Sequence, residues 1–245
     1  MNLFLTSSPF VEDGTALNSA NGLLEALREG LPACPLKALF VASSPDDPQA
    51  TELFGGHVRA AFERAGFVFE SFRFLDRRGQ HCAAALVEQS DLLVLAGGHV
   101  PTQNRFFREL GLRGMLEGFD GAVLGISAGS MNAAEVVYAQ PELPGEALDP
   151  GYRRFLPGLG LTEVMVCPHY NLVRDSVLDG MKLFDDITVP DSAGRCFYLI
   201  PDGTWIGACG GKTELHGEAW AADHGCLRKC CEDGQVLDLP EGADR

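Results

Sequence analysis

The order of apolar runs and helical segments constrains this chain more than any other feature of its sequence. Runs typical of β-strands are expected at residues 3–7, 37–42, 67–74, 91–96 and 121–125, and helical spacing of apolar residues at 18–29, 50–65, 80–89 and 102–117. The run at 91–96 contains a continuous apolar stretch, as in strands buried on both faces of a sheet. This alternation predicts an α/β fold, a three-layer α/β/α sandwich around a mostly parallel central sheet.

The alternation ends after about residue 135, where a proline-rich passage extends to Pro157. Shorter strands are expected at 164–167, 196–200 and 204–207, and one or two antiparallel strands in the tail from about residue 217. No internal repeat, low-complexity tract or linker interrupts the chain. We therefore predict one domain over residues 1–245, with antiparallel strands toward the C-terminus.

The charge and hydropathy of the chain exclude several classes of partner. Its net charge of −15 argues against binding to nucleic acid or to an anionic membrane surface. No apolar run approaches the roughly 20 residues that a membrane helix needs, and the first residues lack the pattern of a signal peptide. A cytoplasmic location is therefore expected, with neither nucleic acid nor membrane as a partner.

The eight cysteines give little indication of a metal site. Five of them are scattered through apolar or strand-like segments, where reduced cysteine behaves as a small apolar residue. Cys226, Cys230 and Cys231 cluster near His224, but their spacing does not fit a zinc-binding pattern. We expect reduced cysteines, no metal and no cofactor.

One motif indicates catalysis. Gly125-Ile126-Ser127-Ala128-Gly129 fits G-x-S-x-G and lies between an expected strand and a helix-compatible stretch. A sharp strand-to-helix turn of this kind exposes the serine hydroxyl above the sheet and needs small neighbours for close packing. Ser127 is thus the predicted nucleophile.

A glycine pair follows the preceding buried strand. Glycine allows a backbone N–H to approach a substrate oxygen closely, so Gly98 and Ala128 are predicted to form an oxyanion hole. Gly97 fits a tight turn at the same place.

A serine nucleophile needs a base. His169 and His99 each follow an expected strand, where a side chain can reach Ser127. Polar, surface-like surroundings are shared by the other four histidines, His57, His81, His216 and His224. His169, just after the strand at 164–167, is the predicted base.

The residues also carry a family resemblance. The chain resembles peptidase E (aspartyl dipeptidase) and the related cyanophycinases, serine peptidases with a class I glutamine-amidotransferase-like (flavodoxin-like) fold. The resemblance covers nearly the whole chain and is most specific at Ala96–His99, Gly125–Gly129, Cys167–Tyr170 and Pro201–Ile206. It implies the same roles for Ser127, His169, Gly98 and Ala128.

The resemblance also implies a third catalytic residue. The family has an aspartate 15 residues after the serine, and that offset falls on Glu142 here. Glutamate can orient a histidine in a Ser-His-Glu triad. Glu142 is therefore predicted, with Glu135 and Asp149 as alternatives.

Two departures from the family bear on substrate choice. The family's Gly-Gly-Asn becomes Gly-Gly-His at His99, and no arginine stands in residues 179–185, where peptidase E binds the substrate's aspartate. We predict that His99, Arg105 and Lys182 bind the substrate, although Lys182 supplies a charge without a bidentate fork. Arg174 is a further candidate. Strict preference for aspartate is not predicted.

We thus predict a serine peptidase that hydrolyses small peptides through an acyl-enzyme, of the dipeptidase or aminopeptidase-like type, acting as monomer or homodimer. Cyanophycinase-like β-aspartyl peptidase and esterase activities are alternatives, as is a catalytically silent ligand-binding protein with this fold. A glutaminase is not expected, because no cysteine occupies a turn like that of Ser127.

Overall fold

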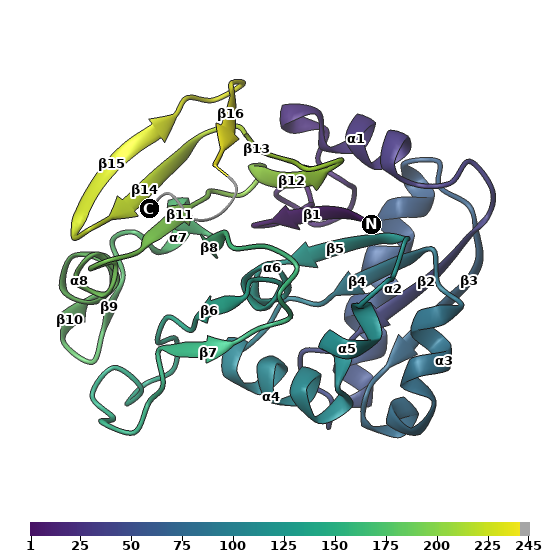
Figure 1. Cartoon of the computed structure of the whole chain (residues 1–245), viewed down its shortest axis with the longest axis horizontal. Coiled ribbons are helices and arrows are strands. Elements are labelled where there is room, and N and C mark those ends of the chain that lie inside the picture. The colour runs from purple at the N-terminus through teal and green to yellow at the C-terminus, as the bar shows by residue number, and fades with distance from the viewer. Residues whose placement is uncertain (241–245) are drawn as a thin grey trace.

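The computed structural model describes residues 1–240. Its centre is an eight-stranded sheet in the order β16-β13-β12-β1-β5-β4-β2-β3 (Figure 1). These strands are β1 (Asn2–Thr6), β2 (Leu36–Val41), β3 (Phe69–Leu75), β4 (Leu92–Leu95), β5 (Ala122–Ile126), β12 (Trp205–Cys209), β13 (Lys212–His216) and β16 (Val236–Leu239). The strands β1, β5, β4, β2 and β3 are parallel to one another. On the other side of β1, each successive pair (β1 with β12, β12 with β13, and β13 with β16) is antiparallel.

Helices cover both faces of this sheet, because successive strand residues point to opposite sides. In β1, Leu3 and Leu5 join the core cluster that contains buried residues of α3, α4 and α5. Phe4, between them, joins the cluster that contains α1 and α2. The helices are α1 (Leu23–Gly30), α2 (Pro48–Arg64), α3 (Ala83–Glu88), α4 (Val100–Leu110) and α5 (Leu112–Leu116). The predicted three-layer α/β/α fold with a mostly parallel central sheet is confirmed.

A second, four-stranded sheet in the order β15-β14-β11-β8 lies beside the first. It contributes buried residues to the core cluster that contains Leu3 and Leu5. Its strands are β8 (Met165–Cys167), β11 (Cys196–Leu199), β14 (Ala219–Asp223) and β15 (Cys226–Cys231), and the two-stranded pairs are β6 (Val136–Tyr138) with β7 (Phe155–Pro157) and β9 (Val177–Leu178) with β10 (Met181–Lys182). The remaining helical segments are α6 (Ala128–Asn132), α7 (Tyr170–Val173), α8 (Val189–Asp191), two 3-10 turns (Ala20–Gly22 and Arg77–Cys82) and a π-helical turn (Leu183–Thr188).

Several predicted boundaries need correction. The helix expected at 102–117 is two helices, because Gly111 adopts a left-handed conformation (φ 68°) that ends α4. The helix expected at 18–29 begins only at Leu23, after a 3-10 turn. The tail from residue 217 holds three strands, β14, β15 and β16, where one or two were expected.

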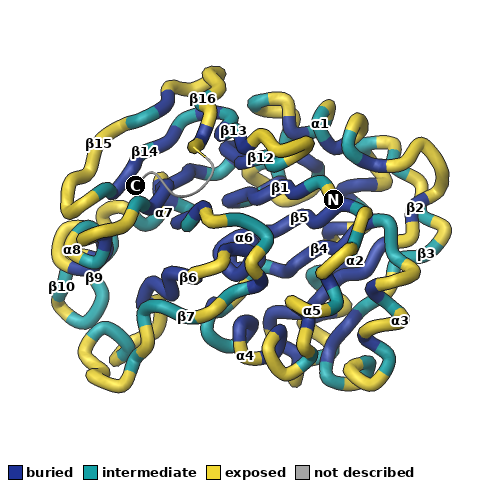
Figure 2. Tube along the Cα trace, viewed as in Figure 1, coloured by how far each residue is buried: buried dark blue, intermediate teal, exposed yellow. Residues whose placement is uncertain are grey.

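Burial follows the layers. In Figure 2 the strands β4 and β5 are buried along their length, whereas the outer faces of the helices and the loops are exposed. No helix among residues 1–240 is both long enough and apolar enough to cross a membrane.

Candidate active site

The candidate catalytic residues lie close together at the carboxyl ends of adjacent parallel strands, the edge where open α/β sheets bind ligands. Ser7 follows β1, Gly98 follows β4 and Ser127 follows β5, and β1 and β4 flank β5 in the sheet. His169 follows β8 of the second sheet, and Asp202 lies in the turn between β11 and β12. The site thus forms where the two sheets meet.

Ser127 has a strained backbone, with φ 50° and ψ −110°, between β5 and α6. A non-glycine residue rarely adopts such a conformation, and it persists only where its surroundings enforce it. The Ser127 N–H donates to the carbonyl oxygens of Thr6 (3.0 Å) and Ser7 (3.1 Å). The Ser130 hydroxyl also donates to the Thr6 carbonyl, at 2.8 Å. These bonds fix the turn against β1.

Both glycines of the G-x-S-x-G motif are required by packing. A Cβ at Gly129 would lie 2.2 Å from the Leu95 carbonyl oxygen, and one at Gly125 would lie 2.7 Å from Ser130 Cα. Only residues without a side chain let α6 lie this close to β4 and β5. The close-packed strand-to-helix turn expected from the motif is therefore present.

His169 connects Ser127 to a carboxylate. Its Nε2 lies 2.9 Å from Ser127 Oγ, and its Nδ1 lies 2.7 Å from Asp202 Oδ1. An ionised Asp202 accepts a hydrogen bond from the protonated Nδ1, which leaves Nε2 unprotonated and able to accept a hydrogen bond from the serine hydroxyl. The three side chains are partly exposed, so a substrate can reach them.

Ser7 bonds both Asp202 and His169 and so fixes their relative position. Its buried hydroxyl donates to Asp202 Oδ1 at 2.6 Å and accepts the His169 backbone N–H at 2.7 Å. Burial raises the pKa of Asp202, but the hydrogen bonds from His169 and Ser7, with the charge of His169, outweigh it and hold the pKa below its usual value of 3.8. Asp202 is therefore ionised at neutral pH.

The glycine loop lies beside the serine. A Cβ placed on Gly97 would lie 3.4 Å from Ser127 Cβ, and one on Gly98 would lie 2.5 Å from Ser43 Oγ. Gly98 is exposed and has φ 154°. Ala128 is the first residue of α6, and N–H groups at the start of a helix have no intrahelical acceptor.

The carboxylate expected from the 15-residue offset is not the one that bonds His169. Asp202 takes the place predicted for Glu142, because the β11–β12 turn, not the proline-rich loop, lies behind the ring. Of the alternatives, Glu135 pairs with Arg113, and Asp149 accepts the Gly151 N–H. Neither bonds His169.

Glu142 instead lines a cavity of about 410 Å³ next to Ser127 and His169. Most of the wall is apolar and includes Met131, Val173 and Leu178. Within residues 1–240, this wall contains no lysine or arginine, and His169 and Glu142 are its only charged or titratable residues.

Solvent reaches Glu142, yet protein atoms also surround its carboxylate. This burial raises its pKa, the charges of His99 and His169 act to lower it, and that of Glu146 acts to raise it further. Solvent at the exposed side chain screens these effects.

The three predicted substrate-binding residues lie outside the cavity wall. Both ring nitrogens of His99 are engaged, with Thr102 Oγ1 at 2.8 Å and Glu146 Oε1 at 2.9 Å. Arg105 is exposed on α4, and Lys182 is exposed on β10 and pairs with Asp185 at 3.0 Å. The additional candidate, Arg174, pairs with its neighbour Asp175.

Cys226, Cys230 and Cys231 lie along β15. In the part of the chain that the structure describes, no group of three His, Cys, Asp or Glu side chains has a metal-binding arrangement.

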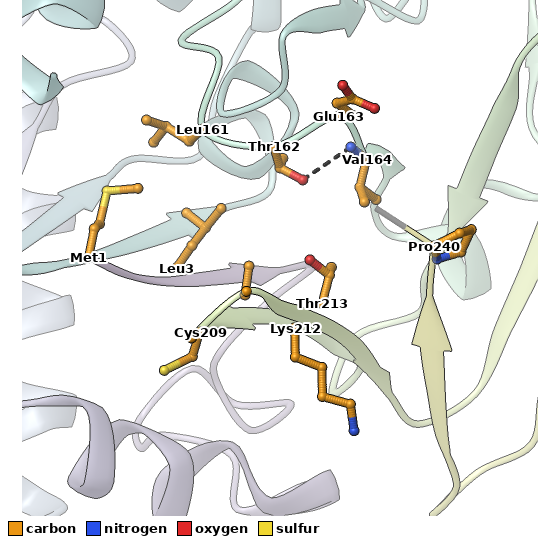
Figure 3. Close-up of a pocket in the computed structure, with 13 residues that line it drawn as sticks. Met1, Leu3, Leu161, Thr162, Glu163, Val164, Cys209, Lys212, Thr213 and Pro240 are labelled. Atoms are coloured by element: carbon orange, nitrogen blue, oxygen red, sulfur yellow. Dashed lines mark hydrogen bonds between the residues drawn. The ribbon is translucent and has the colours of Figure 1, made fainter. Parts of the chain in front are cut away.

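Another hollow, of about 600 Å³, lies at the amino end of β1 (Figure 3). Its walls include Leu3, Glu163 and Lys212. It is larger than the cavity at Ser127, but it lacks a nucleophile paired with a base. The chemistry places the candidate site at Ser127.

Two residues of the site, Asp202 and Ser7, were not predicted from the sequence. Asp202 lies within the specific motif Pro201–Ile206, so a carboxylate just before a strand was the available signal. Ser7 carried no signal, because its partner His169 is 162 residues away.

Comparison with known proteins places this geometry in a family. The sequence profile of Peptidase family S51 matches residues 3–216. The fold is similar to the crystal structure of a candidate peptidase E protein from Listeria monocytogenes EGD-e, with a TM-score of 0.60 and 16% identity over 94% of this chain and 98% of that one. No curated protein matches the sequence significantly. The chain belongs to peptidase family S51 and is a serine-type peptidase.

Proposed function

We propose that this peptidase cleaves short peptides through a Ser127-His169-Asp202 triad. The observation that carries the proposal is the continuous hydrogen-bonded path from Ser127 Oγ through His169 to Asp202, with distances of 2.9 and 2.7 Å. Such a path activates a serine hydroxyl, which is otherwise a weak nucleophile.

The reaction proceeds by acyl transfer. His169 Nε2 takes the hydroxyl proton as Ser127 Oγ attacks the scissile carbonyl, and the N–H groups of Gly98 and Ala128 stabilise the oxyanion. His169 then gives the proton to the leaving amine, and an acyl-enzyme remains. Water then attacks this ester while His169 takes its proton, and His169 returns the proton to Ser127 Oγ as the bond between Oγ and the acyl carbon breaks and the acid leaves.

Asp202 and Ser7 act through His169. Asp202 holds the ring in the tautomer with Nδ1 protonated and stabilises the imidazolium that forms. Ser7 is a positioning residue, because it bonds both Asp202 and the His169 backbone.

The size of the cavity favours a small substrate. Sites of about 300–1,000 Å³ enclose small molecules, and the cavity beside Ser127 has about 410 Å³. Among residues 1–240, its wall contains no lysine or arginine, so we do not assign a preference for aspartate.

A panel of free dipeptides tests the proposal. Alanyl-leucine, aspartyl-leucine, glutamyl-leucine and β-aspartyl-arginine are incubated with wild type and with Ser127→Ala, and released amino acids are quantified. Turnover of at least one member, lost in Ser127→Ala, is expected. Failure of folded wild type to cleave any of them, while longer peptides are cut, would overturn the assignment to short peptides.

A further inference from the structure

Within residues 1–240, the wall of the cavity beside Ser127 carries a single acidic side chain, Glu142, and is otherwise uncharged apart from His169. For an acidic substrate group, Glu142 would be a repulsive neighbour. For a cationic group it is a partner at the edge of the reacting centre. The net charge of −15 acts in the same direction, because it favours the approach of cations.

No side chain among residues 1–240 bonds the carboxylate of Glu142, although the charges of His99 and His169 act on it. None of the ion pairs among residues 1–240 involves Glu142, and of the surrounding backbone only the Val100 N–H interacts with its carboxylate. The orienting role at His169 belongs to Asp202. Glu142 therefore has no part in the hydrogen-bonded path to Ser127.

Its neighbour Glu146, in contrast, is fully engaged. Glu146 Oε1 bonds His99 Nε2 at 2.9 Å, and Oε2 accepts the N–H groups of Glu142 (2.8 Å) and Leu143 (2.9 Å). These bonds fix the backbone that carries Glu142 against the start of α4. A carboxylate held on a fixed loop can select between substrates at little entropic cost.

We propose that Glu142 determines specificity by binding a cationic nitrogen of the substrate, either its α-ammonium group or a lysine or arginine side chain. The inference rests on the proposed function of Ser127. A basic side chain also fits the rest of the wall, because its methylene groups can pack on Val173 and Leu178 while its charge meets the carboxylate.

Matched substrates separate the two sources of charge. Lysyl-leucine against norleucyl-leucine isolates the side-chain cation, and each dipeptide against its N-acetyl derivative isolates the α-ammonium group. We compare kcat/KM for wild type, Glu142→Gln, Glu142→Lys and the control Glu163→Gln. Glu163 is exposed and lines the other hollow (Figure 3), not the cavity beside Ser127, so its substitution removes one charge outside that cavity.

In wild type and Glu163→Gln, we expect at least one of these ratios to favour the cation by about five- to tenfold, the range of a partly exposed ion pair. Glu142→Gln should bring that ratio close to one. Glu142→Lys should bring it below one and should raise kcat/KM for glutamyl-leucine relative to norleucyl-leucine. Unchanged ratios in Glu142→Gln would overturn the proposal. An equal loss of kcat/KM for all substrates would also overturn it, because the charge of Glu142 would then act on His169 and not on the substrate.

Failure of this inference is distinguishable from failure of the proposed function. Turnover that depends on Ser127 but ignores substrate charge refutes the role of Glu142 alone. If no dipeptide is cleaved, we measure the binding affinity of Ser127→Ala by calorimetry. This variant should bind lysyl-leucine more tightly than norleucyl-leucine, or the free-amine dipeptides more tightly than their N-acetyl derivatives. That preference should be absent in Ser127→Ala/Glu142→Gln, and its persistence there would refute the role of Glu142.

Discussion

His169 Nδ1 lies 2.7 Å from Asp202 Oδ1, although the two residues are 33 positions apart in the chain. The contact joins the end of β8 to the turn between β11 and β12. Because β8 pairs with β11 in parallel, the carboxyl ends of both strands lie at the same edge of the second sheet. In the proposed mechanism, the second sheet thus supplies the base and the carboxylate, and the central sheet supplies the nucleophile.

Replacement of Asp202 by asparagine should lower kcat by about 10³- to 10⁴-fold with little change in KM, because the ring loses its orienting charge and preferred tautomer. Steady-state kinetics on any cleaved dipeptide measures this. Glu142→Gln, assayed with an N-acetylated neutral substrate, is the matched control and should retain most of kcat. The reverse ranking of the two variants would restore Glu142 as the orienting carboxylate.

Ser7→Ala should lower kcat by about tenfold or more, because a hydrogen bond to a charged group is lost and Asp202 is held less firmly. Ser7→Thr, which keeps a hydroxyl, should recover part of the loss. The pKa of Asp202 should also rise in Ser7→Ala, because Asp202 loses a hydrogen bond that lowers it, and the pH dependence of thermal unfolding measures this rise. An unchanged kcat and an unchanged pH dependence of unfolding would contradict a positioning role for Ser7.

The stability of the protein should depend on the ionisation of Asp202. Its pKa is lower in the folded chain than the usual 3.8, so its contribution is present above about pH 5 and is lost as pH falls through the folded pKa. Thermal unfolding of wild type and Asp202→Asn between pH 3 and 7 should show a Tm difference that shrinks on acidification. A difference that grows toward low pH would contradict this assignment.

Gly129→Ala should destabilise the fold by about 1–3 kcal/mol or more, because its Cβ would overlap the Leu95 carbonyl oxygen at 2.2 Å. Gly114→Ala is the matched control, since a Cβ there meets no atom within 4 Å and alanine favours the helix. Urea unfolding gives both free energies. Equal stabilities would mean that α6 does not need to lie so close to β4.

Much of the architecture follows from local pattern. The apolar runs at β2, β4 and β5 and the spacing in α2 predicted the parallel sheet and its covering helices. Asp47 caps the start of α2, because its side chain accepts the Ala50 N–H at 3.0 Å, and Pro48 is the first residue of the helix. Such local signals persist in the fold because neighbouring residues carry them.

Features that depend on contacts between residues far apart in the chain could not be predicted from the sequence pattern. A 15-residue offset cannot show that the loop at Glu142 passes beside the cavity while the turn at Asp202 passes behind His169. The break at Gly111 was missed because apolar spacing continues across it. His99 was expected near the substrate, but its ring is taken by Thr102 and Glu146.

Covalent labelling by a fluorophosphonate, mapped by peptide mass spectrometry, tests the central claim most directly. We expect a single label on Ser127, strongly slowed labelling in Asp202→Asn and none in Ser127→Ala. Absence of label on folded wild type, or equal labelling of Ser127→Ala, would contradict a nucleophile at Ser127.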